Sequence, residues 1–189
     1  MVRHMRPQRL IELGSGFSTL VLACACEANR ADGSPVEMVS NDPFERGVVP
    51  PRLPGLTRLV ERGAEAVPLE EFERLDAGDI LFVDTTHTVK LGSEVNYIVL
   101  DVLPALRPGV IVHFHDIYLP YEYPRPLVEF HAAYWAEQYL LQAFLAMNPG
   151  FEVLFANQAV AREQGERFKE LVPSYTGENS PSGFWLRRV

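Results

Sequence analysis

Histidine and aspartate residues follow two apolar segments of this sequence, at the points where each segment ends. Asp84 and His87 come after one segment, and His115 and Asp116 follow another. If both segments are neighbouring parallel strands, their carboxyl ends meet at one rim of a sheet. An imidazole there can act as a general base, because its ordinary pKa lies near 6.5.

Three interpretations of these four residues remain open. His87 or His115 could take a proton from a substrate, with Asp116 orienting the base. Asp84 and Asp116 could instead hold a divalent metal that lowers the pKa of a substrate hydroxyl. The four side chains could also form structural hydrogen bonds only.

A glycine-rich turn lies near the start of the chain, at residues 12–16 (Glu-Leu-Gly-Ser-Gly). Its glycines allow a tight turn and a close approach of the backbone to a ligand. A dinucleotide-binding turn would need a third glycine where this chain has Thr19. The turn therefore suits a nucleoside that carries an amino-acid tail better than it suits a pyrophosphate. A glycine turn without a ligand is the alternative.

A carboxylate and two small residues end the next two apolar segments. Asp42 can accept hydrogen bonds from both hydroxyls of a ribose, as carboxylates do at this position in other nucleoside-binding sheets. Alternatively, Asp42 caps a helix that begins at Pro43. Gly63 and Ala64 are small enough for an adenine to lie flat against them, which is a weaker indication.

The candidate site residues must be positioned by helices and strands. The spacing of apolar residues along the chain predicts strands that alternate with helices. Such alternation indicates a mostly parallel sheet with helices on both faces. The last connection is too short for a full crossover helix, so the final strand should be antiparallel. His113, inside the fifth strand, is expected to pack in the core. The predicted strands are 9–13, 36–40, 57–60, 79–84, 110–114, 151–156 and 183–188, and the predicted helices are 17–29, 67–75, 91–106, 127–147 and 162–171.

Composition predicts one globular domain that spans residues 1–189, with 47% hydrophobic and 22% charged residues. The net charge of -8 argues against a nucleic-acid partner. No apolar run approaches the roughly 20 residues that would span a membrane. Cys24 and Cys26, two apart on a predicted helix, cannot form a disulfide, so we expect a cytoplasmic protein.

Five motifs occur in an order that resembles the class I S-adenosylmethionine (SAM)-dependent methyltransferase superfamily. They look most like its branch known as methyltransferase family 24, and the resemblance spans about residues 6–188. The first motif alone is moderately specific for this superfamily, and the five motifs in this order are much more specific for it. The motifs are residues 12–19, 42–44, 82–87, 113–117 and 135–141.

This resemblance implies an α/β, Rossmann-like fold with a seven-stranded, mostly parallel sheet and an antiparallel last strand. It also implies SAM in the cleft, with Gly14 and Gly16 along the methionine part and Asp42 on the ribose. The residues expected to bind the cofactor or shape its pocket are Glu12, Gly14, Ser15, Gly16, Ser18, Thr19, Asp42, Pro43, Gly63, Ala64 and Asp84.

The resemblance also bears on the reaction. Related sugar and catechol O-methyltransferases are similar in placing acidic metal ligands after the same two strands. We therefore expect methyl transfer to an oxygen of a small molecule or sugar, with a divalent metal such as Mg²⁺ as an optional second cofactor. A SAM- or nucleoside-binding domain without catalysis is the alternative, and a nicotinamide-dependent oxidoreductase is disfavoured by Thr19.

One departure concerns the start of the chain. The first predicted strand begins at residue 9, whereas relatives generally carry a helical segment before it that helps to close the site. The expectation is that this is a short or fragmentary version, or that another subunit of a homo-oligomer supplies the cover. The sequence does not identify the acceptor.

Overall fold

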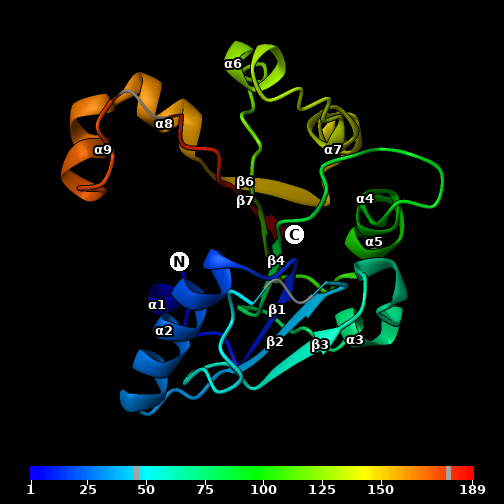
Figure 1. The fold of residues 1–189 in the computed structure, drawn as a ribbon, viewed down its shortest axis with the longest axis vertical. Coiled ribbons are helices and arrows are strands. Elements are labelled where there is room, and N and C mark those ends of the chain that lie inside the picture. The colour runs from blue at the N-terminus through cyan, green and yellow to red at the C-terminus, as the bar shows by residue number, and fades with distance from the viewer. Residues whose placement is uncertain (45–46, 178–179) are drawn as a thin grey trace.

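The computed structural model describes residues 1–44, 47–177 and 180–189. Seven strands form one sheet in the order β3-β2-β1-β4-β5-β7-β6 (Figure 1). The last strand runs antiparallel to both of its neighbours, and the other pairings are parallel. The predicted fold class is therefore confirmed. The strands are β1 (Arg9–Leu13), β2 (Glu37–Asp42), β3 (Arg58–Glu61), β4 (Ile80–Val83), β5 (Ile111–Phe114), β6 (Phe151–Ala156) and β7 (Phe184–Arg188).

Helices lie on both faces of the sheet and produce two separate apolar clusters. On one face, α1 and α2 pack residues such as Leu22 and Cys26 against Leu10 and Met38 of the strands. The other face is covered mainly by the helical residues between β4 and β5 and by α7. The helices are α1 (Val2–Met5), α2 (Phe17–Ala31), α3 (Leu69–Glu73), α4 (Glu94–Tyr97), α5 (Leu103–Ala105), α6 (Arg125–Glu129), α7 (Glu137–Leu145), α8 (Asn157–Glu163) and α9 (Gly165–Leu171), with a 3-10 turn η1 (Ala64–Ala66) and a π-helical turn η2 (Ile98–Val102).

The two central strands β4 and β5 are buried along their whole length. Burial on both faces explains why β4 reads as a continuous apolar run and why β5 is apolar apart from His113. Val83 pairs with Phe114 at their carboxyl ends, and the amide of His115 donates to the carbonyl of Val83 at 2.9 Å. The residues that follow the two strands therefore lie at one rim of the sheet, as the sequence predicts.

The predicted helix over residues 127–147 is not continuous, although α7 and the end of α6 lie within it. The chain forms α6 and α7 with an irregular segment between them, in which Ala132 has a φ of 50°. The amides of Ala136 and Glu137 donate to the carbonyl of His87, at 2.9 and 3.2 Å. These bonds to the loop after β4 replace bonds within a helix, so a tertiary contact decides where α7 begins.

Two further findings concern membrane-spanning helices and the cysteines. Within the described residues, no helix combines the length and apolar character needed to cross a membrane. Cys24 and Cys26 are free thiols, as their spacing predicts.

His113 is a buried core residue of β5, as predicted. Its ring lies between those of Phe82 and Trp185, with centroids 4.2 and 4.4 Å away. Burial lowers the pKa of His113 to about 3. The folded protein therefore keeps this imidazole neutral, whereas the unfolded chain protonates it below about pH 6.5. The stability that His113 contributes is fully present above pH 6.5 and is lost as the pH falls toward 3.

We predict that His113→Phe makes stability less dependent on pH. The variant keeps a ring between Phe82 and Trp185 but has no group that titrates. From pH 7 to pH 4 it should lose roughly 2–3 kcal/mol less unfolding free energy than the wild type, since a tenfold change in proton affinity is worth about 1.4 kcal/mol. Urea unfolding at both pH values measures this, and equal losses in the two proteins would contradict it.

Candidate active site

The glycine turn between β1 and α2 is fixed by contact with the loop after β4. Gly14 has a φ of 90°, and a Cβ atom there would lie 1.8 Å from the carbonyl oxygen of Asp84. Only glycine fits both the backbone conformation and this approach. Gly16 differs, because a Cβ atom there would meet nothing within 4 Å. Packing therefore requires glycine at position 14 and leaves open space beside position 16.

Glu12 lies beneath the turn and not in the cleft. Its buried carboxylate accepts hydrogen bonds from the hydroxyls of Ser18, Thr19 and Ser40, at 2.8, 2.7 and 2.6 Å. Burial raises the pKa of Glu12, and these hydrogen bonds only partly oppose that effect. Thr19 also accepts from the amide of Gly16 at 2.9 Å. Glu12, Ser18 and Thr19 thus hold the turn in place without lining the cleft, so of their two expected roles the geometry supports shaping the pocket.

A cleft of about 420 Å³ lies above the turn. It gathers predicted residues from the ends of four strands, namely Gly14, Ser15, Asp42, Pro43, Gly63, Ala64 and Asp84. Sequence reasoning missed Asn41, Phe44, Glu65, Thr85 and Thr86, which also line it, and Glu94 at the start of α4 lines it as well. Most of these are chain neighbours of predicted residues. Phe44, with 68% of its surface exposed, offers an apolar ring to a planar ligand.

Asp42 connects the glycine turn after β1 with the loop after β2 at the mouth of the cleft. One carboxylate oxygen accepts from the amide of Ser15 and the other from the amide of Phe44, both at 2.7 Å. The described residues between β2 and β3 include no helix, and Pro43 and Phe44, which follow Asp42, form a bend. Each carboxylate oxygen has a further lone pair, so Asp42 can still accept from the hydroxyls of a ligand.

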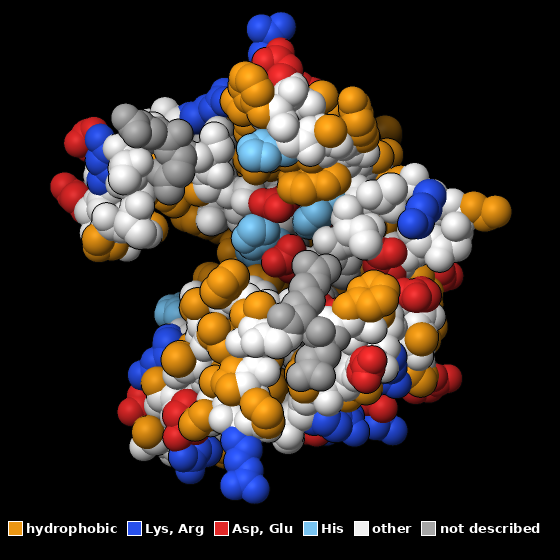
Figure 2. Space-filling model, viewed as in Figure 1, with side chains coloured by type: hydrophobic (Ala, Val, Ile, Leu, Met, Phe, Trp, Pro, Cys, Tyr) orange, Lys and Arg blue, Asp and Glu red, His pale blue; other side chains and the backbone are white. Residues whose placement is uncertain are grey.

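His87 lies at the centre of an acid–base cluster beside this cleft. Its Nδ1 atom lies 2.7 Å from Oε2 of Glu137. Its Nε2 atom faces Asp84 and Asp116, at 3.7 and 3.6 Å. The ring of Trp135 packs against it, with a centroid distance of 4.5 Å. In Figure 2, histidine and acidic side chains gather near the centre of the visible face.

The electrostatic environment favours a protonated His87. Burial alone would lower its pKa, but the hydrogen bond and charge of Glu137, with the charges of Asp116 and Asp84, raise the pKa above its ordinary value. Sequence reasoning missed Glu137, although this residue belongs to the fifth motif. The predicted continuous helix over residues 127–147 gave no reason to expect a hydrogen bond between Glu137 and His87. His87 and Glu137 are both buried, so this pair holds the loop after β4 against α7.

His115 is the accessible histidine of the cluster, with 42% of its side chain exposed. Its Nδ1 atom lies 3.1 Å from Asp116 and 3.8 Å from Asp84. Interaction with the Asp116 carboxylate raises the pKa of His115. Asp116 is itself fixed by the hydroxyl of Ser182 at 2.7 Å. The structure thus brings together all four side chains that the sequence predicts at this rim.

Two backbone positions in the cluster are strained. His87 and Asp116 have φ values of 58° and 56°, in the left-handed region that residues other than glycine rarely adopt. Such strain is retained where surrounding contacts fix a functional geometry. Here the contacts are those to Glu137 and Ser182.

Comparison of the sequence with known protein families identifies the family of this chain. Residues 11–117 match the family described as a methyltransferase domain, methyltransferase family 24. The chain belongs to this family, a branch of the class I SAM-dependent methyltransferases. No curated protein sequence is similar enough to this methyltransferase to count as a match.

Solved structures share the fold of this methyltransferase. The apo-structure of CmcI-N160 is 14% identical with a TM-score of 0.53, and the match covers 100% of this chain and 67% of that one. The structure of CmcI-D160 with Mg and SAM is 16% identical with a TM-score of 0.50, covering 100% and 68%. CmcI-N160 with SAH is 14% identical with a TM-score of 0.53, covering 100% and 73%.

The expected metal ligands of this methyltransferase, Asp84 and Asp116, do lie at one rim. Both carboxylates, however, already face the Nε2 atom of His87. Across the described ranges, no three side chains of His, Cys, Asp or Glu are arranged to hold a metal ion. This donor set does not fit a ready-made metal centre, so we derive no step through a metal.

We predict that Gly14→Ala destabilises the methyltransferase whereas Gly16→Ala does not. A methyl group at position 14 meets the Asp84 carbonyl and forces an unfavourable φ, which should cost about 2–4 kcal/mol. At position 16 the added methyl group has free space. Thermal and urea unfolding compare the two variants with the wild type. Equal stability of all three proteins would contradict the close contact between the two loops.

Proposed function

We propose that this methyltransferase transfers the methyl group of SAM to an oxygen of a small hydroxylated molecule, such as a sugar or natural product. One observation carries the proposal. Asp84 lines the cleft and also lies 3.7 Å from His87 and 3.8 Å from His115. An acceptor that reaches a cofactor in the cleft would therefore also reach the acid–base cluster.

The residues of the cleft fit a nucleoside with an amino-acid tail. Asp42 has lone pairs for ribose hydroxyls, and the small residues Gly63 and Ala64 leave room for an adenine. Gly14 and Ser15 line the cleft, and the methionine part would lie against their backbone, whose amides already donate to the carbonyl of Asn41 and the carboxylate of Asp42. Family membership and the SAM and SAH named in two CmcI structures support this choice of ligand. When bound, SAM supplies a methyl group that its sulfonium makes electrophilic.

We assign the base to His115, because it is the exposed histidine beside Asp84 and Asp116. Its imidazole takes the proton of the acceptor hydroxyl as the oxygen becomes a nucleophile. Asp116 orients the ring and stabilises the imidazolium that results. His87 is a positioning residue, since its buried ring is held by Glu137 and faces the two aspartates.

We predict that the protein binds S-adenosylhomocysteine and that Asp42 is needed for it. Isothermal titration should give a micromolar Kd for the wild type. Asp42→Asn keeps an acceptor for the Ser15 amide but loses the charge, and binding should weaken about tenfold or more, as expected for charge-assisted hydrogen bonds. Glu37→Gln, outside this cleft, is the matched control. No binding by the wild type would contradict the cofactor assignment.

We predict that His115→Gln abolishes most turnover while cofactor binding is retained. Loss of a general base should lower kcat about 10²–10⁴-fold. The assay screens hydroxylated acceptors with methyl-¹³C SAM, with Mg²⁺ and with EDTA, and identifies the product by its ¹³C shift. His4→Gln, exposed and in α1, should behave like the wild type.

The same assay separates the competing functions. Cofactor binding without turnover on any hydroxylated acceptor would favour a binding domain without catalysis. A methylated nitrogen or sulfur in the product would show that the oxygen assignment is wrong. Activity that EDTA abolishes would favour a metal at Asp84 and Asp116 over base catalysis alone, and binding of NADH in place of S-adenosylhomocysteine would favour an oxidoreductase.

A further inference from the structure

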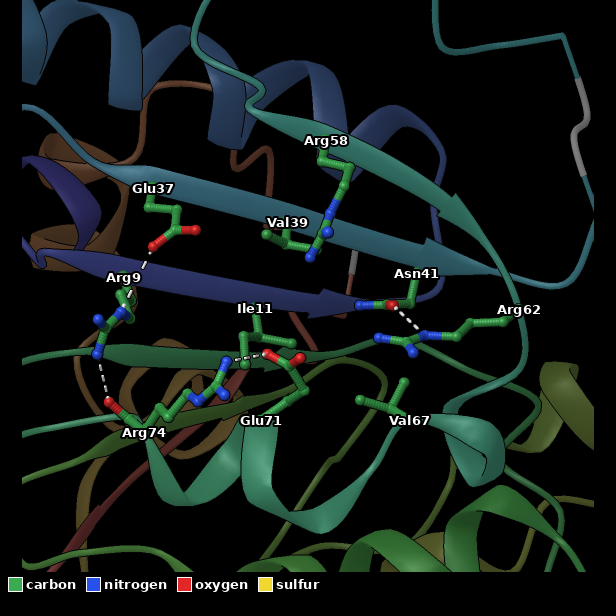
Figure 3. A pocket seen from close by; sticks show the side chains of 10 residues that line it. All are labelled: Arg9, Ile11, Glu37, Val39, Asn41, Arg58, Arg62, Val67, Glu71 and Arg74. Atoms are coloured by element: carbon green, nitrogen blue, oxygen red, sulfur yellow. Dashed lines mark hydrogen bonds and ion pairs between the residues drawn. The ribbon is translucent and has the colours of Figure 1, made fainter.

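A second groove, of about 180 Å³, lies on the sheet face formed by β1, β2 and β3 (Figure 3). Ile11 of β1 pairs with Val39 of β2, and Val39 pairs with Arg58 of β3, so these three side chains stand on one face. The connecting helix α3 has only five residues and packs on η2 and α5. It borders the groove, whose apolar floor is formed by the buried Ile11 and the half-buried Val39.

Three arginines extend over this floor toward one another. Figure 3 shows Arg58, Arg62 and Arg74 pointing into the groove, with Glu71 between them. Arg62 donates to the side-chain oxygen of Asn41 at 3.0 Å, which leaves its charge uncompensated. Arg74 approaches Glu71 only at 3.5 Å. Within the part of the chain that the structure describes, Arg58 has no carboxylate partner.

The groove carries excess positive charge in an acidic protein. Four arginines and two glutamates line it, an excess of two positive charges, whereas the chain has a net charge of -8. Arg9 is already engaged, at 3.4 Å from Glu37 and 2.7 Å from the carbonyl of Arg74. Guanidinium groups that line one groove without enough carboxylates repel one another, and a bound anion would reduce that repulsion.

We propose that the groove between Arg58, Arg62 and Arg74 binds a small oxyanion with two negative charges, of the phosphate class. Planar guanidinium groups donate paired hydrogen bonds that match phosphate oxygens. The apolar floor strengthens these interactions by lowering the local dielectric constant. The groove shares only Asn41 with the cofactor cleft, so the anion occupies a separate site.

The proposal is tested by titrating the full chain with inorganic phosphate at constant ionic strength, with sodium chloride as the balancing salt. Isothermal titration and the rise in Tm both report binding. Arg58→Gln should weaken phosphate binding roughly tenfold, and Glu71→Gln should strengthen it several-fold by removing a like charge. Arg52→Gln, an exposed arginine outside this groove, should leave binding unchanged.

Three results would overturn the proposal. The first is a wild type that responds to phosphate no more than to chloride. The second is equal phosphate binding in Arg58→Gln and Arg52→Gln. The third is loss of the phosphate response when S-adenosylhomocysteine saturates the protein, because the anion would then lie in the cofactor cleft. Opposite effects of Arg58→Gln and Glu71→Gln that persist with the cofactor product bound would support a separate site.

Discussion

The close approach of Gly14 to the carbonyl of Asp84 is the constraint on which the site depends. It joins the turn after β1 to the loop after β4, and so places the Asp84 side chain in the wall of the cleft. The same loop then carries His87 toward Asp116, which follows β5. One backbone contact therefore makes the cleft and the acid–base cluster neighbours.

Two buried glutamates stabilise this arrangement in different ways. Buried carboxylates require hydrogen-bonding partners or an opposite charge. Glu12 has three hydroxyl donors, which tie β1 to α2 and β2 beneath the glycine turn. Glu137 has the imidazole of His87, which ties α7 to the loop after β4. Both residues shape the site without lining the cleft.

Local sequence patterns predicted the fold and the cleft. Contacts between distant segments decided the roles of Glu12 and Glu137, the interruption of the predicted helix and the arginine groove. The strands, the glycine turn and Asp42 follow from periodicity and from the positions of strand ends. The sequence left the role of Glu12 open between binding the cofactor and shaping its pocket, because a motif does not say whether a strand-end carboxylate points into the cleft or beneath the turn. Glu137 was missed because its partner lies 50 residues away, and the same contacts interrupt the predicted helix. The arginine groove was missed because its residues come from separate strands and loops.

The central claim is that the cofactor cleft and the histidine cluster form one active site. The most direct test records the imidazole ¹H–¹⁵N signals of the protein during titration with S-adenosylhomocysteine, with assignments from single histidine variants. The account predicts that the signals of His87 and His115 shift as the cleft fills, whereas that of His4 in α1 does not. Binding that leaves both cluster histidines unchanged, or that shifts His4 equally, would contradict it.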